Sequence, residues 1–191
     1  MPVIDASPYR LPFLAGLRLL GEAMRRLRER GEYQPTLVGG AAVELYTAGA
    51  VATGDFDLVT MAQAEFEAVL AELGFERPSG RGRSLRGFIH STLPMGVEVV
   101  GSSMMGGSAD PMRRRRFTLD DGGEILVIGI EDLIADRMGQ AAAVSGGDRV
   151  MLGQARLLYA TAETVDEAYL DARIRNESLG DYSLADLAAI E

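Results

Sequence analysis

The chain has 191 residues, of which 47% are hydrophobic, 25% charged and 6% aromatic, and its formal net charge is −9. This balance is too apolar for a disordered chain and too charged for a membrane protein, and the length favours one domain with a small appendage. The chain has no cysteine and one histidine, His90, which excludes disulfide scaffolds, thiol catalysis and zinc sites built on cysteines or several histidines.

Hydrophobic spacing in the first half predicts alternating helices and strands. Residues 11–30 place large apolar side chains on one helical face, and Gly31 is typical of a helix end. Thr36–Val38 is a short apolar strand that ends at two glycines, Gly39 and Gly40. The other expected elements are a helix over 41–47, a strand over 55–59 and a helix over 62–73.

The second half is predicted to complete a sheet and then to become helical. Asp120–Gly123 is a strong hairpin signal, and the expected strands are 85–90, 97–100, 117–119 and 125–128. Only helical patterns follow from Glu131 onward. We therefore predict an α/β (α+β) fold, with a mixed sheet flanked by helices in residues 1–130 and a helical C-terminal subdomain in residues 131–191.

The sequence favours a cytoplasmic protein without membrane contact. Its first residues lack the basic and apolar segments of a signal peptide, and no apolar run approaches the ~18–20 residues of a membrane span. All 19 basic residues are arginine, so lysine chemistry is excluded. Residues 131–191 carry 12 acidic residues against 5 arginines, so any nucleic-acid contact is expected in the first two-thirds of the chain.

Asp55 and Asp57 are the first candidate site residues. Side chains alternate along a strand, so these two carboxylates are expected on one face, about 6–7 Å apart. Two such ligands suit Mg²⁺ or Mn²⁺, which bind through carboxylates and substrate phosphates. With 13 aspartates in 191 residues, chance alone supplies about one such pair, so the neighbouring sequence has to decide.

That context consists of two glycines upstream and one acid downstream. A strand that runs into Gly39-Gly40 and then a helix lets a phosphate approach bare backbone N–H groups, although a tight turn uses the same residues. Glu98 is the single acid in the apolar strand Gly96–Val100. A charge there is costly unless it is paired or binds a metal, although a half-exposed strand residue fits the same pattern.

In this order, Val38-Gly39-Gly40, Asp55-Phe56-Asp57-Leu58 and Val97-Glu98-Val99 resemble the nucleotidyltransferase superfamily, whose members have polymerase-β-like palms. Within it, the chain looks most like the minimal bacterial branch that includes AbiEii-type, toxin-like proteins, because Glu131–Arg137 is reminiscent of that branch. The resemblance spans roughly residues 33–160. Two features depart from the pattern: Gly40 stands where many members have serine, and the later helix has no lysine.

The resemblance implies a Mg²⁺-dependent (or Mn²⁺-dependent) transfer of a nucleoside monophosphate from a nucleoside triphosphate. Asp55 and Asp57 would hold the metal, and Glu98 would complete a second metal site and help to activate an acceptor hydroxyl. Gly39 and Gly40 would bind phosphate through backbone N–H groups. The acceptor is left open between RNA, a protein side chain and a small molecule, and a toxin–antitoxin role implies a possible protein partner.

Two alternatives stay open. The fold could serve as a non-catalytic binding module or as one component of a two-protein toxin–antitoxin system. Asp55–Val59 also fits the nucleophile motif of haloacid-dehalogenase phosphatases, with Asp120-Asp121 as their later acidic pair. Against this second alternative, Val51–Gly54 makes a poor buried strand and residues 120–123 make a better hairpin turn.

Arginines and a glycine-rich segment add three secondary expectations. Arg137 lies on the apolar arc of its helix, so it is expected to meet the site carboxylates as a structural tie or the phosphates as a ligand. Arg113–Arg116 is either a solvated run or a phosphate-binding pair. Ser102–Gly107, close to Glu98, is expected to be a mobile loop and a possible lid.

Overall fold

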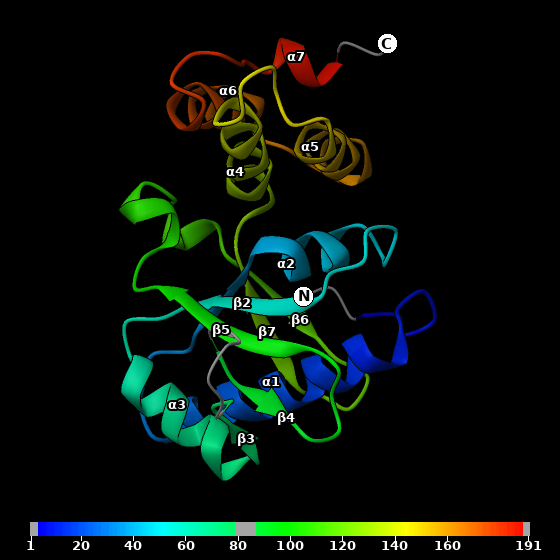
Figure 1. Ribbon diagram of the computed structural model, residues 1–191. Coiled ribbons are helices and arrows are strands. Elements are labelled where there is room, and N and C mark those ends of the chain that lie inside the picture. Colours follow the sequence, from blue (N-terminus) through cyan, green and yellow to red (C-terminus); the bar gives the residue numbers. More distant parts are fainter. Residues whose placement is uncertain (1–3, 79–86, 189–191) are drawn as a thin grey trace.

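The computed structural model describes residues 4–78 and 87–188. Its central feature is a five-stranded sheet in the order β5-β2-β1-β7-β6, in which β1 pairs parallel with β7 and antiparallel with β2 (Figure 1). The predicted mixed sheet is therefore confirmed. Its strands are β1 (Thr36–Val38), β2 (Asp55–Val59), β5 (Gly96–Gly101), β6 (Arg115–Thr118) and β7 (Glu124–Val127).

One face of the sheet carries the main core, against helices α1 (Leu11–Glu29) and α3 (Gln63–Glu72). Alternation along β2 directs Phe56 to this face, where its ring stacks on Phe13 of α1 with centroids 5.4 Å apart. Phe56 is fully buried. The same alternation directs the flanking aspartates to the other face.

Helix α2 (Gly39–Tyr46) begins directly after β1, two residues earlier than predicted. Gly39 has φ +64°, which a residue with a side chain rarely adopts, so the chain can turn from strand into helix without a linker. In Figure 1, α2 lies on the side of the sheet opposite α1. Val38, the last residue of β1, pairs with Asp57 of β2, so the two glycines follow directly beside that aspartate.

The remaining small elements differ in part from the prediction. β6 begins at Arg115, so the arginine run enters the strand. Of the predicted strand 85–90, residues 85 and 86 lie outside the described residues, and β4 (Ile89–His90) pairs with β3 (Phe75–Glu76) in a separate small sheet. Two 3₁₀ turns, η1 (Met104–Gly107) and η2 (Pro111–Arg113), follow β5.

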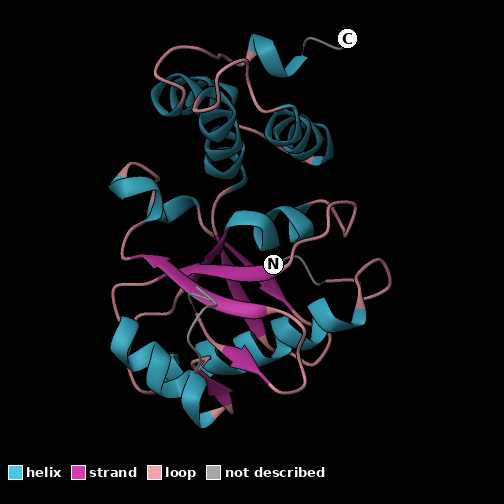
Figure 2. Cartoon of the chain, viewed as in Figure 1, coloured by secondary structure: helices cyan, strands magenta, loops and turns pink. Residues whose placement is uncertain are grey.

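The C-terminal part of the chain is helical, and Figure 2 shows it stacked at one end of the sheet-containing part. Asp148 and Asp166 cap the second and third of these helices through side-chain bonds to backbone N–H groups. No described helix is both long and apolar enough to cross a bilayer. The helices are α4 (Ile130–Ala142), α5 (Arg149–Thr161), α6 (Glu167–Glu177) and α7 (Ala185–Ala188).

Candidate active site

The three predicted carboxylates lie on neighbouring positions of two strands. β2 and β5 are parallel and in register, with Asp57 beside Glu98 and Asp55 beside Gly96. Asp55 is exposed, whereas Asp57 and Glu98 are half-buried. Among the described residues, no three acidic or histidine side chains stand close enough to hold one metal ion together. Asp55 and Asp57 share one face of β2, and Glu98 lies beside Asp57 on the outer strand.

Asp57 carries the largest electrostatic cost of the three. Burial is the largest cause that raises the pKa of its carboxyl, the charges of Asp55 and Glu98 add to it, and Arg137 acts in the opposite direction; together they bring the pKa to about 6. The arginine therefore compensates the acids only in part. The site holds surplus negative charge, which favours binding of a cation.

This raised pKa predicts a pH-dependent contribution to stability. The native carboxyl binds its proton more tightly than the unfolded one, whose pKa is near 3.8, so the stability from Asp57 falls as the pH rises from 4 to 6. After allowance for solvent screening, we expect a loss on the order of 1 kcal/mol. The measurement is the melting temperature of the wild type minus that of Asp57→Asn. We expect this difference to be near zero at pH 4 and negative above pH 6. A difference in melting temperature that does not change with pH would contradict the prediction.

The two glycines fit closely around the acids. A Cβ at position 39 would collide with the Asp57 carboxylate, and a Cβ at position 40 would lie 2.5 Å from Thr53 Oγ1. Thr53 Oγ1 itself lies 3.3 Å from the carbonyl oxygen of Asp55 as a hydrogen-bond donor. A side chain at position 40, such as the serine of many nucleotidyltransferases, would require Thr53 to move.

Gly39→Ala is expected to lower the free energy of unfolding by about 3 kcal/mol, because it combines a left-handed backbone with a collision against Asp57. Gly31→Ala is the matched control, since Gly31 has φ +76° but open space around its Cβ, and it should cost only about 1 kcal/mol. Chemical denaturation of both variants measures the two values. Equal losses would mean that the contact with Asp57 is not tight.

An ion pair between the exposed Arg10 and the buried Glu44 fixes the loop that leads into β2. Glu44 of α2 is fully buried and accepts hydrogen bonds from the Arg10 guanidinium, at 2.7 and 3.1 Å, and from the backbone N–H of Thr53, at 2.7 Å. Arg10 also donates to the carbonyl oxygen of Thr53 at 2.8 Å. Helix α2 thereby holds the residue two positions before Asp55.

A cleft of about 400 Å³ opens between these elements and helix α4. It brings Gly39, Gly40 and Asp57 together with Arg137, whereas Asp55 and Glu98 are not among its lining residues. Glu98 lines a neighbouring cleft with Gln63 and Glu67 of α3. The first cleft is also lined by residues of segments that the sequence analysis singled out, namely Val38, Ser103, Met104, Met105, Gly106, Leu133 and Asp136. The lining residues that it missed are Val59, Val100, Ile128 and Gln140.

Arg137 is buried in this cleft, with an incomplete set of partners. Its Nη2 lies 2.9 Å from Asp136 on the same helix, its Nη1 lies 3.6 Å from the Met151 sulfur, and its Nε has no hydrogen-bond partner among the described residues. The expected tie to the sheet carboxylates is therefore not formed as an ion pair. A buried guanidinium donor without a partner is costly, and an anion in the cleft would satisfy it.

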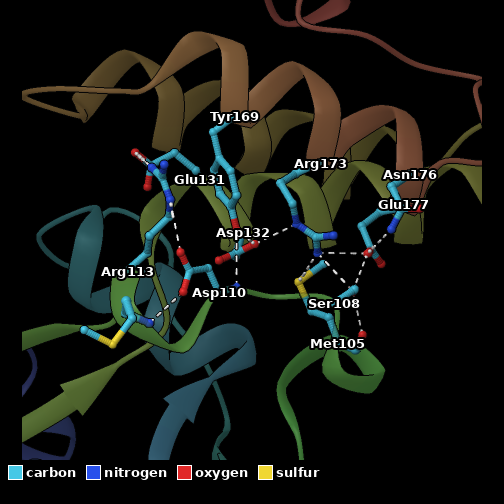
Figure 3. Close-up of polar contacts among 11 residues, drawn as sticks. Met105, Ser108, Asp110, Arg113, Glu131, Asp132, Tyr169, Arg173, Asn176 and Glu177 are labelled. Atoms are coloured by element: carbon cyan, nitrogen blue, oxygen red, sulfur yellow. Dashed lines mark hydrogen bonds and ion pairs between the residues drawn. The ribbon is translucent and has the colours of Figure 1, made fainter.

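The loop after β5 forms one wall of the cleft and is tied to helix α6 (Figure 3). Arg173 donates to the Met105 sulfur at 3.3 Å and to Ser108 Oγ at 3.2 Å, and Ser108 Oγ donates to Glu177 at 3.0 Å. Met105 adopts φ 49°, a left-handed conformation that needs such support. The segment predicted to be a mobile loop is thus a 3₁₀ turn held by polar contacts.

The same network explains the acids at the start of α4. Asp132 is fully buried and accepts hydrogen bonds from Arg173 Nε at 2.8 Å and Tyr169 Oη at 2.9 Å. Glu131 accepts from the backbone N–H of Asp166 at 3.3 Å. These residues join α4 to α6, as Figure 3 shows, and so fix the helices around the cleft.

Members of the arginine run have separate structural partners. Arg113 pairs with Asp166 at 2.8 Å and lies over the Tyr169 ring, and Arg116 pairs with Glu124 at 3.2 Å. Arg114 instead donates to the carbonyl oxygen of Pro111 at 2.7 Å. The run is therefore neither wholly solvated nor a single phosphate-binding pair.

Three solved structures resemble the architecture of this chain. An antigenic nucleotidyltransferase-like protein from Paracoccidioides brasiliensis superimposes with a TM-score of 0.57 at 16% identity, covering 90% of this chain and 91% of that one. ANT(2")-Ia in complex with adenylyl-2"-tobramycin gives 0.54 at 16% identity, covering 86% and 95%. The solution structure of the antibiotic-resistance factor ANT(2'')-Ia gives 0.52 at 14% identity, covering 85% and 90%.

No family model matches the chain, and no curated protein matches its sequence. At 14–16% identity the similarity concerns the fold, which is nucleotidyltransferase-like.

Proposed function

We propose, starting from this nucleotidyltransferase-like fold, that the protein binds a nucleoside triphosphate with Mg²⁺ and transfers its nucleoside monophosphate to an acceptor hydroxyl. The observation that carries the proposal is the cleft that joins Gly39, Asp57 and Arg137. It combines glycine backbone that lines the cleft, the carboxylate proposed as a metal ligand, and a buried guanidinium with an unsatisfied donor. These are the groups that a metal-bound triphosphate needs.

The donor set fits Mg²⁺ rather than a softer metal. Asp55 and Asp57 supply carboxylate oxygens, and Mg²⁺ is commonly held by one or two carboxylates together with substrate phosphates and water. Uncompensated charge around Asp57 gives the site its affinity for a cation. When bound, the ion would neutralise phosphate charge as the reaction proceeds. Mn²⁺ has the same ligand preference and would serve in its place.

Groups of the protein itself would bind the phosphates and accept the proton of the acceptor hydroxyl. Backbone N–H groups at the start of α2 and the Arg137 guanidinium would hold the phosphates that leave as pyrophosphate. The acceptor hydroxyl oxygen attacks the α-phosphorus, the bond from that phosphorus to the bridging oxygen breaks, and pyrophosphate departs. Glu98, on the outer strand beside Asp57, would take the hydroxyl proton. Positioning and charge neutralisation account for most of the catalysis.

Arg137→Met is expected to weaken binding of the Mg²⁺–triphosphate about tenfold or more, because a charge-assisted contact to phosphate is lost. The melting temperature of the protein alone should change little, since Asp136 keeps a hydrogen bond from Gln140 at 2.9 Å. Arg149→Met, at an exposed arginine, is the control for net charge. A large drop in melting temperature with unchanged nucleotide affinity would make Arg137 a structural residue.

Thermal shift measurements with each of the four ribonucleoside triphosphates, with and without Mg²⁺, test the proposal. We expect stabilisation that requires both nucleotide and metal. If no nucleotide stabilises the protein, the enzymatic proposal fails, and a non-catalytic component of a two-protein, toxin–antitoxin-like system is favoured. If nucleotide binds but no transfer is detected with RNA, protein or small-molecule acceptors, the chain is a nucleotide-binding module.

The acceptor class is also a matter for experiment. ANT(2")-Ia was solved with adenylyl-2"-tobramycin, so a small hydroxyl-bearing molecule is one candidate here. RNA ends and protein side chains are the others. Incubation with an α-labelled triphosphate and each class, followed by separation of the products, would identify the labelled acceptor.

A further inference from the structure

A second cleft of about 360 Å³ continues along the same face of the sheet. It shares Val59, Ser103 and Met104 with the first cleft and extends towards Tyr33 and Met61. Because Asp57 and Val59 are same-face neighbours on β2, the second cleft starts one side-chain position beyond the proposed metal ligand. The two clefts therefore lie end to end, with Met104 between them.

The second cleft has a different chemical character from the first. Only one of its described lining residues is charged, Arg114, and none is acidic. Its apolar groups include Met61, Met104 and Pro111, and the Tyr33 side chain beside them is 67% exposed. An apolar cleft beside an exposed aromatic ring is suited to binding a flat heterocycle. It is not suited to a polyamine, because a polyamine would need carboxylates as partners.

Arg114 is the side chain of this cleft that can donate hydrogen bonds to a ligand and so orient it. Its Nε donates to the carbonyl oxygen of Pro111 at 2.7 Å, and its Nη1 lies 3.4 Å from Thr36 Oγ1. Among the described residues no carboxylate forms an ion pair with it. These two bonds fix the guanidinium at the cleft wall and leave Nη2 available as a donor. Arginine donors select hydrogen-bond acceptors, such as the ring carbonyl and N7 of guanine.

We propose that the second cleft holds the base of the bound nucleotide, and that Arg114 favours bases with a ring carbonyl group over adenine. The inference rests on the proposed function, because it takes the triphosphate to lie in the first cleft. β2 ends at Val59, so the four residues from Asp57 to Met61 span at most about 13 Å, which leaves room for a nucleoside along this face. The acceptor then approaches from the opposite side, where Asp55 is exposed and Glu98 lines a separate cleft.

Affinities of the wild-type protein for Mg²⁺ complexes of tripolyphosphate, GTP, ITP and ATP test this assignment. We expect GTP and ITP, which share the carbonyl at position 6, to bind about tenfold more tightly than ATP, as for one hydrogen bond to a charged donor. The Arg114→Met variant should bind GTP, ITP and ATP with the same affinity. Arg115→Met is the matched control, because the next residue of the run does not line this cleft.

A second variant keeps the test valid if Arg114→Met fails to fold. Tyr33→Ala removes an exposed ring, and it should weaken the binding of all three nucleotides about fivefold without changing the affinity for tripolyphosphate. Equal or stronger binding of ATP relative to GTP in the wild type, or wild-type nucleotide affinity in Tyr33→Ala, would overturn the inference and leave the proposed function intact. If none of the ligands binds, tripolyphosphate included, both the inference and the proposed function are overturned.

Discussion

Asp57→Asn is expected to weaken Mg²⁺-dependent nucleotide binding by about a hundredfold and to raise the melting temperature of the protein alone at pH 7.5. Binding falls because an amide replaces a carboxylate ligand of the metal. Stability rises because Asp57 is ionised at that pH despite its burial and its two acidic neighbours, a cost that asparagine does not carry. Relief on the order of 1 kcal/mol corresponds to about 2–4 °C for a chain of this size.

Calorimetric titration with a non-hydrolysable triphosphate and differential scanning fluorimetry measure these two effects. Asp181→Asn is the control, because it makes the same chemical change at an exposed aspartate after α6. Opposite signs for stability and binding are the signature of a functional residue held at a cost to the fold. A destabilised Asp57→Asn variant whose folded fraction still binds nucleotide normally would show that the carboxylate is structural.

Arg173→Met is expected to produce the largest loss of stability, about 3–5 kcal/mol, or roughly 10 °C in melting temperature. Asp132 is fully buried, and its Oδ2 already has no hydrogen-bond partner among the described residues. Without Arg173 its charge would keep only the hydrogen bond from Tyr169. The variant also frees Met105 and Ser108, so the wall of the nucleotide cleft should loosen together with the helices.

Two further variants separate the buried charge from the general loss of an arginine. Arg175→Met removes a guanidinium from the same helix, but its partner, Asp171, is on the surface, so the cost should stay below about 1 kcal/mol. Asp132→Asn combined with Arg173→Met should recover much of the loss, because no uncompensated buried charge is left. Equal losses for the two single arginine variants would mean that the network in Figure 3 contributes little to stability.

The sequence predicted the acidic positions of the site because strand periodicity is a local property. Alternation along β2 sends Phe56 into the core and the two aspartates to the opposite face, whatever the strand pairs with. The glycine pair is equally local, since a residue with a side chain rarely adopts the left-handed backbone found at Gly39. The position of Glu98 beside Asp57 depends on register and was predicted only through the family resemblance.

Contacts between distant segments could not be predicted in the same way. A helical wheel places Arg137 on the apolar arc but cannot show that this arc borders an open cleft, or that Asp136 is its ion-pair partner. The turn at Met105 is held by Arg173, 68 residues away, so its local sequence gives no sign of that support. Periodicity describes which side of an element faces inward, whereas the cleft is formed by side chains from several elements.

The most direct test of the account is a crystal structure with Mn²⁺ and a non-hydrolysable nucleoside triphosphate, because anomalous scattering locates the metal independently. We predict an anomalous peak between the carboxylates of Asp55 and Asp57, with the phosphates against the Gly39-Gly40 backbone and Arg137. A metal bound away from these aspartates, or a nucleotide that does not enter the cleft next to Asp57, would contradict the central claim.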